Sequence, residues 1–157
     1  MSWAWTDKPF LVGPMPVGII AVVWPELEVV EPVSVRFDPI GFKRKLMKLD
    51  ERADGLDRVS EMEQYADDLV LCITDPESAC RYKDRINLFR PVTPPPHEHG
   101  RRTYMLVGLQ PPRSGTNVAQ HATAYLISAR KHDRFIKKWP SATNTQFGGQ
   151  HRRRRTR

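Results

Sequence analysis

The strongest pattern in the chain is a run of apolar residues that recur every three or four positions between residues 46 and 73. This spacing places them on one stripe of a helix and predicts a helix over residues 41–73. Gly55 leaves a division into two helices open, because Ser60 and Glu63 have the capping-box spacing that starts a helix. We interpret the stripe as the core of a domain and not as a dimerising coiled coil. It consists of Leu46, Leu49, Ala53, Leu56, Val59, Met62, Ala66, Leu69 and Ile73.

A second helix is expected directly after this one. Asp75 has the place of an N-cap residue and Pro76 that of the first helical position, which predicts a helix that ends near residue 88. Together, the two predicted helices would form a helical hairpin.

Shorter apolar stretches predict strands at residues 17–24, 33–37 and 103–109. In the stretch 33–37, two valines and Phe37 alternate with polar residues and share one face. Because prolines stand at both ends of the connection between the first two stretches, we expect a hairpin of edge strands.

Residues 117–138 fit two interpretations. One is a single long helix, and the other is a strand over "TAYLIS", residues 123–128. The stripe of the long helix would hold Val118, Ala122, Tyr125, Ala129 and Phe135.

These patterns predict an α+β fold: a small domain with a helical hairpin and a few short strands, plus extended proline-rich and basic arms. A chain of 157 residues is long enough to bury the core of one domain, and its 14 prolines indicate long irregular segments. We expect an extended N-terminal arm at 1–16, a strand pair and helical hairpin at 17–89, a proline-rich linker at 90–102, a basic strand-helix segment at 103–139 and a basic C-terminal tail at 140–157.

Two tryptophans stand out in the predicted N-terminal arm. In an extended chain Trp3 and Trp5 point the same way and form an apolar patch. We predict that they bind a partner. The alternative is that the arm folds onto its own domain.

Charge is distributed unevenly along the chain. Residues 1–90 hold 12 basic and 16 acidic side chains, a net charge of −4, whereas residues 91–157 hold 13 basic and 2 acidic ones, a net charge of +11. Such an asymmetry indicates that the C-terminal portion contacts a polyanion.

The basic residues of this portion predict an RNA-binding surface. Arg130, Arg134 and Lys137 recur at helical spacing close to Phe135 and Trp139. Guanidinium groups that bind phosphate and rings that stack on bases are typical of RNA-binding surfaces, so RNA is favoured over DNA. The predicted RNA-binding residues are Arg101, Arg102, Arg113, Arg130, Lys131, Arg134, Lys137, Lys138, Arg152, Arg153, Arg154, Arg155 and Arg157.

Other candidate chemistry is weak. His97 and His99 share one face of an extended chain, which suits a metal, but no further ligand stands nearby, and we interpret them as part of a solvated loop. The segment "PRSGTN", residues 112–117, predicts either a phosphate site at a helix N-terminus or an ordinary turn. No nucleophile motif or phosphate-binding loop motif occurs. We therefore expect no enzymatic activity, no cofactor and no metal.

Cysteine content and hydropathy bear on the compartment. Cys72 and Cys80 are too few for a disulfide scaffold, which favours a reducing, intracellular compartment. Prolines interrupt the longest apolar run, so we expect no transmembrane segment. The N-terminus carries no recognisable transit peptide, and a mitochondrial location stays open.

These observations lead to a functional hypothesis. We expect a non-catalytic structural subunit of a large ribonucleoprotein particle, in particular a ribosomal protein, including one of an organelle. It would bind ribosomal RNA through its basic C-terminal half and neighbouring protein subunits elsewhere. The alternatives are an accessory subunit of a multiprotein assembly such as a respiratory complex, whose basic end contacts acidic protein or an anionic membrane surface, and a viral protein that packages nucleic acid.

Overall fold

The computed structural model describes residues 3–51, 57–96 and 103–147, and within these ranges the chain forms a seven-stranded mixed sheet. The strand order is β1-β2-β6-β5-β4-β3-β7, and β2 and β6 are parallel whereas the other neighbours are antiparallel. The elements are β1 (Phe10–Val12), α1 (Ile19–Val23), β2 (Ser34–Phe37), α2 (Pro39–Asp50), α3 (Arg58–Gln64), α4 (Ala66–Thr74), β3 (Ser78–Tyr82), β4 (Arg85–Val92), β5 (Thr103–Gln110), β6 (Val118–Ser128), α5 (Ala129–Lys138), β7 (Ser141–Thr143) and α6 (Asn144–Phe147).

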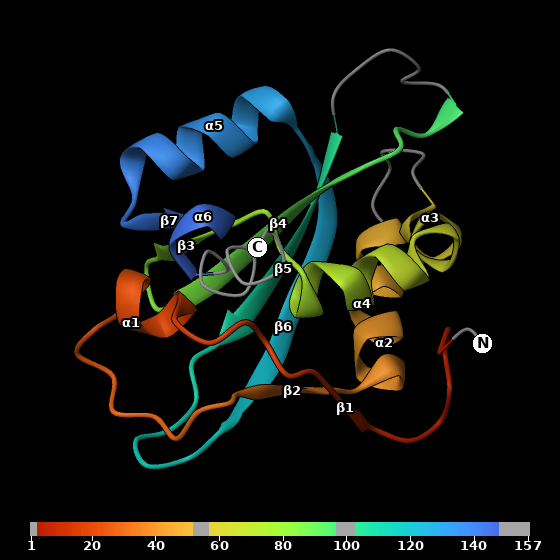
Figure 1. The fold of residues 1–157 in the computed structure, drawn as a ribbon. Coiled ribbons are helices and arrows are strands. Elements are labelled where there is room, and N and C mark those ends of the chain that lie inside the picture. The colour runs from red at the N-terminus through yellow and green to blue at the C-terminus, as the bar shows by residue number, and fades with distance from the viewer. Residues whose placement is uncertain (1–2, 52–56, 97–102, 148–157) are drawn as a thin grey trace, which may run out of the picture.

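Helices cover both faces of the sheet (Figure 1). The larger hydrophobic core lies between the sheet and helices α1, α2 and α4, and it includes Met105 and Val107 of β5. The smaller core lies under α5 and includes Tyr104 and Leu106, the alternate residues of the same strand. Because β5 is buried on both faces, its sequence is a continuous apolar run.

The predicted mixture of helices and strands is confirmed, but the expectation of a few short strands is wrong. Strand β6 has 11 residues, and β4 and β5 have 8 each. The error has two sources: the predicted helix at residues 76–88 is a pair of strands, and residues 117–138, for which a helix and a strand were both open, begin with the longest strand of the sheet.

The predicted helix at residues 76–88 is in fact the β3-β4 hairpin. Lys83 and Asp84 form its turn, and Lys83 has a positive φ of 56°. Asp75 does not start a helix, because it ends α4 and its side chain accepts a hydrogen bond of 2.9 Å from Arg90 of the hairpin. The predicted helical hairpin is therefore wrong.

The N-terminal strand prediction is also partly wrong. Residues 17–24 contain the short helix α1 and not a strand. The prediction was wrong because a continuous apolar run does not distinguish a buried helix from a buried strand. The prediction for residues 33–37 is confirmed by β2, but this strand pairs with β1 and β6 and not with the stretch before it.

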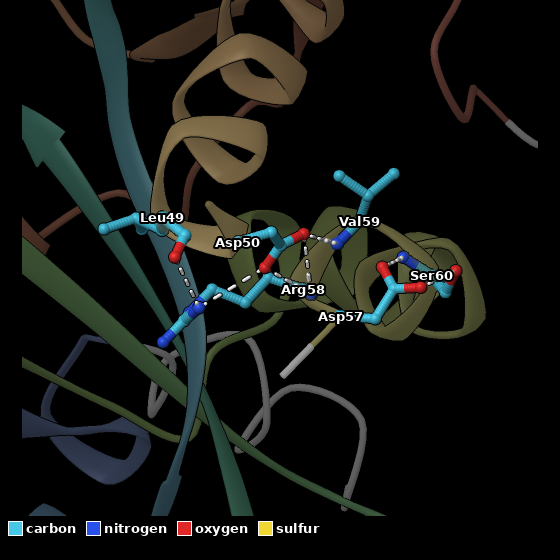
Figure 2. A network of polar contacts seen from close by, with 6 residues as sticks. All are labelled: Leu49, Asp50, Asp57, Arg58, Val59 and Ser60. Atoms are coloured by element: carbon cyan, nitrogen blue, oxygen red, sulfur yellow. Dashed lines mark hydrogen bonds and ion pairs between the residues drawn. The ribbon is translucent and has the colours of Figure 1, made fainter. Parts of the chain in front are cut away.

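The described residues of the long apolar stripe lie on three helices, α2, α3 and α4, whereas Ala53 and Leu56 lie outside the described residues. The first break falls after Asp50, whose carboxylate accepts hydrogen bonds from the backbone N–H groups of Arg58 (2.9 Å) and Val59 (3.4 Å), as Figure 2 shows. Asp57 then caps α3 by accepting a hydrogen bond of 3.0 Å from the Ser60 backbone N–H. The Asp50 carboxylate thus connects the end of α2 to the start of α3, and the predicted division at this place is real, with Asp57 as the cap.

The two interpretations of residues 117–138 are resolved in favour of a strand followed by a helix. Val118–Ser128 form β6 and Ala129–Lys138 form α5. The strand predicted at residues 103–109 is confirmed by β5. The first three residues of the predicted linker, 90–92, belong to β4, which pairs with β5.

The N-terminal arm packs on its own domain. The Trp3 side chain is 8% exposed, and its indole N–H donates a hydrogen bond of 2.7 Å to the Ala66 carbonyl oxygen. The indole N–H of Trp5 donates to Glu63. Of the two alternatives for the arm, a surface for a partner or packing onto its own domain, the structure shows the packing.

One partly buried histidine, His121, lies among aromatic rings beside the larger core. The His121 ring centroid is 4.6 Å from that of Phe37 and 4.8 Å from that of Phe42. Its Nε2 atom is buried and has no hydrogen-bond partner among the described residues. Burial, together with the positive charge of Lys45, lowers the pKa of His121 to about 3.

We expect His121 to make the protein acid-sensitive. In the unfolded chain, His121 binds a proton below about pH 6.5, whereas in the folded protein it binds one only below about pH 3. The free energy of unfolding therefore decreases as the pH falls from about 6.5 to about 3. The contribution is at most about 1.4 kcal/mol per pH unit. Urea unfolding of wild type and His121→Gln, followed by tryptophan fluorescence at several pH values, checks this. Equal pH slopes for the two proteins would contradict it.

The two cysteines should be unreactive in the folded protein. Burial raises the pKa of both thiols, that of Cys80 to about 12, and Cys72 Sγ lies 3.4 Å from the Leu88 carbonyl oxygen. Since the thiolate is the nucleophile, a disulfide-exchange reagent at neutral pH should label neither cysteine in buffer and both in denaturant. Rapid labelling of either cysteine without denaturant would show that these burial assignments are wrong.

Candidate nucleic-acid interface

Helix α5 begins where β6 ends. Ser128 is the last residue of the strand and the N-cap of the helix, and its Oγ accepts a hydrogen bond of 3.2 Å from the Lys131 backbone N–H. At the other end, Lys137 and Lys138 lie in the last turn, where positive charge interacts favourably with the helix dipole.

The inner side of α5 is anchored by aromatic contacts. The His132 ring stacks on Tyr104 with a centroid distance of 4.0 Å and an interplanar angle of 6°. Phe135 lies against Tyr82 and Phe89 of the β3-β4 hairpin, at centroid distances of 5.2 and 5.5 Å. These contacts fix the orientation of the helix on the sheet.

His132 also connects α5 to the sheet by hydrogen bonding. Its Nε2 lies 2.8 Å from Ser78 Oγ, and its Nδ1 lies 3.0 Å from Asp133 Oδ1. Serine, histidine and aspartate are the residue types of a hydrolytic triad. Here, however, Ser78 is 2% exposed beneath the helix, where a substrate does not reach it. The arrangement is suited to holding the helix in place.

The outer side of α5 is strongly cationic. Its exposed side chains include a single carboxylate, that of Asp133. No ion pair within the described parts of the chain involves the cations of α5. Two of them lie beside aromatic rings, Lys131 Nζ at 5.3 Å from the Tyr125 centroid and Lys138 Nζ at 5.7 Å from that of Trp139. The cationic residues are Arg130, Lys131, Arg134, Lys137 and Lys138.

The other predicted RNA-binding residues do not all belong to this surface. Arg113 is exposed in the loop before β6, at the opposite end of that strand from α5 and roughly 30 Å away along it. Arg101, Arg102 and the arginines of 152–157 lie outside the described residues, as do His97 and His99. The structure therefore brings five of the predicted residues together.

The segment 112–117 forms a turn followed by a strand. Thr116 Oγ1 donates a hydrogen bond of 2.7 Å to the Arg113 carbonyl oxygen, and β6 begins at Val118. The phosphate site expected at a helix N-terminus is therefore absent from this segment.

The described ranges hold neither a group of metal-binding side chains nor a membrane-spanning helix. Among them, no group of three histidine, cysteine, aspartate or glutamate side chains has an arrangement that could hold a metal. No helix in the same ranges is long and apolar enough to cross a membrane. Tyr125 was not among the predicted RNA-binding residues, and it is an exposed residue of β6, as in the strand interpretation of residues 123–128.

Removing the His132 ring should loosen the attachment of α5. His132→Ala eliminates the stack on Tyr104 and leaves Ser78 Oγ without its partner, so we expect a loss of about 2–4 kcal/mol in the free energy of unfolding. Lys137→Ala, an exposed change on the same helix, is the control and should cost less than about 0.5 kcal/mol. Urea unfolding measures both. Similar losses for the two variants would speak against this anchoring role.

No protein-family model, curated protein or solved structure matches the chain. Its function is therefore inferred from its own residues.

Proposed function

We propose that this protein binds RNA through α5 as a non-catalytic structural subunit of a ribonucleoprotein particle. The observation that carries the proposal is the set of five exposed cations on one helix whose inner side is fixed to the sheet. Cations held in a fixed array lose little conformational freedom when they bind a phosphate backbone, which favours binding.

The residue types on α5 favour a nucleic acid over a simple anion. Arg130 and Arg134 carry planar guanidinium groups that bind phosphate with two hydrogen bonds. Tyr125 is exposed and Trp139 is partly exposed, and each lies beside a lysine of α5. Accessible rings of this kind stack on unpaired bases. A single-stranded RNA segment offers both phosphates and unpaired bases.

We expect binding to depend on salt through the α5 cations. For single-stranded RNA, each phosphate contact contributes about 0.7 to the slope of log affinity against log salt. Arg134→Gln combined with Lys137→Gln should therefore lower that slope by about 1.4. Fluorescence anisotropy with a labelled single-stranded RNA, over a series of salt concentrations, measures it.

The control removes the same charges elsewhere. Lys8 and Arg36 are exposed, and Arg36 lies opposite Gln120, about 26 Å along β6 from the N-cap of α5. Lys8→Gln with Arg36→Gln should leave the salt slope unchanged. Equal effects of the two double variants, or binding that is indifferent to salt, would refute the proposed interface. Binding to anionic vesicles without any binding to RNA would instead favour an accessory subunit at a membrane.

Deleting residues 152–157 tests the contribution of the tail. The deletion removes five arginines, and we expect both a weaker affinity and a lower salt slope in the same assay. An unchanged affinity would exclude the tail from the interface.

A further inference from the structure

A pocket of about 260 Å³ lies between α2, α3 and strand β6. Four consecutive strand residues, Thr123 to Leu126, line it. Side chains of a strand alternate between the two faces of the sheet, so a pocket that contacts four residues in a row must run along the edge of the strand. This edge is open because β2 pairs with β6 only at residues 118–120, while β5 occupies the other side.

The backbone of β6 supplies hydrogen-bonding groups to this pocket. Lys45 Nζ donates a hydrogen bond of 3.2 Å to the Ala122 carbonyl oxygen, which therefore points away from β5. The register between β5 and β6 shifts at Ala122, which lies between the partners of Gly108 and Leu109. Beyond this shift, residues two apart direct their backbone groups to the same side, so alternate members of residues 123–126 direct theirs to the open edge that the pocket follows. Within the described parts of the chain, no hydrogen bond outside the sheet involves Ala124 or Leu126.

The walls opposite the strand are apolar. Leu46 and Leu49 of α2 and Met62 of α3 form them. A slot with apolar walls and a polar edge fits a flat ring, whose faces contact the walls while its edge exchanges hydrogen bonds with the backbone. Nucleobases are flat rings with donors and acceptors at their edge.

The charges at the rim orient such a ligand. On the α3 side, the pocket is lined by two carboxylates, those of Asp57 and Glu61, and by one arginine, Arg58. The carboxylates repel a phosphate group. Arg58 is already engaged, because its Nη1 donates to Asp50 Oδ1 at 3.3 Å and to the Leu49 carbonyl oxygen at 3.2 Å (Figure 2).

The opposite rim leads to α5. Tyr125 lines the pocket, and Lys131 Nζ of α5 lies 5.3 Å from the centroid of its ring. For a base in the pocket, the nearest cation of α5 is therefore on the side of Tyr125. This cation would attract the phosphate group of the same nucleotide. The pocket and the cationic helix form one continuous surface through this pair of residues.

We infer that this pocket binds a nucleobase, carried by the RNA that lies on α5 or by a free nucleotide. The inference rests on the proposed function, since α5 is taken to hold the phosphates. In this arrangement, the walls from α2 and α3 contact the ring, the open edge of β6 reads its donors and acceptors, and Lys131 binds the phosphate.

Amide chemical shifts of the full-length protein test the inference directly. Adenosine monophosphate, or else a ten-residue single-stranded RNA, should shift the amide signals of residues 123–126. Ribose 5-phosphate has the sugar and phosphate without the base, and it should leave these signals unchanged. The inference is overturned if neither base-containing probe shifts them. It is also overturned if only an extended peptide of alternating valine and threonine does so, because the edge would then accept a strand.

A variant that fills the pocket distinguishes the contribution of base binding to affinity from that of the phosphate contacts. Leu49→Trp places an indole in the slot, and it should weaken RNA binding about tenfold without changing the salt slope. Met47→Trp adds the same ring to an exposed site on α2 and should bind RNA like wild type.

The two proposals fail in different ways. RNA binding by Leu49→Trp at wild-type strength and salt slope would refute the base pocket and leave the α5 interface standing. Salt-independent binding by the wild type would refute the interface. The nucleotide titration of the wild-type protein decides about the pocket even if Leu49→Trp does not fold.

Discussion

The difference in length between two neighbouring strands positions both parts of the proposed RNA-binding surface. Strand β6 has 11 residues, but its parallel neighbour β2 has 4 and pairs with only its first three positions. Beyond Gln120, β6 is therefore held by β5 alone, and its other edge faces α2. The projecting part of the strand has two consequences, because it carries α5 at its end and leaves backbone groups unpaired along its side. Both the cationic helix and the pocket depend on it.

The cationic helix needs strong packing on its inner side. Five like charges within ten residues repel one another and destabilise an isolated helix. The stack of His132 on Tyr104 and the contacts of Phe135 oppose this repulsion from the inner side. The outer side is therefore free to concentrate charge, at a cost in stability that the smaller core offsets. Binding a polyanion would relieve the repulsion, so stability and binding are coupled through this helix.

The sequence predicts those structural features whose signal lies in a short segment. It does not predict features that depend on contacts between residues far apart in the chain. The stripe of residues 46–73 was sufficient to predict helices, and the alternation of residues 33–37 was sufficient to predict β2, because one buried face imposes each pattern. The β3-β4 hairpin was mistaken for a helix because its strands lie between two cores, where the period of two is hidden, and because Asp75 has a favourable cap sequence but is bound by Arg90. The cations of α5 are close together in sequence, so their shared helix could be predicted, whereas the pocket joins residues about 75 positions apart and has no linear signature.

The two parts of the proposed surface would contribute differently to recognition. Phosphate contacts on α5 supply affinity that falls with salt and does not distinguish sequences. A base held between Leu49 and the edge of β6 would add affinity that salt affects little, and the backbone groups along this edge would select its donors and acceptors. Because backbone groups cannot be removed by ordinary substitution, this selectivity would tolerate many changes in the walls as long as the slot keeps its width. The length of the β2-β6 pairing would then control specificity more strongly than the identity of any wall residue.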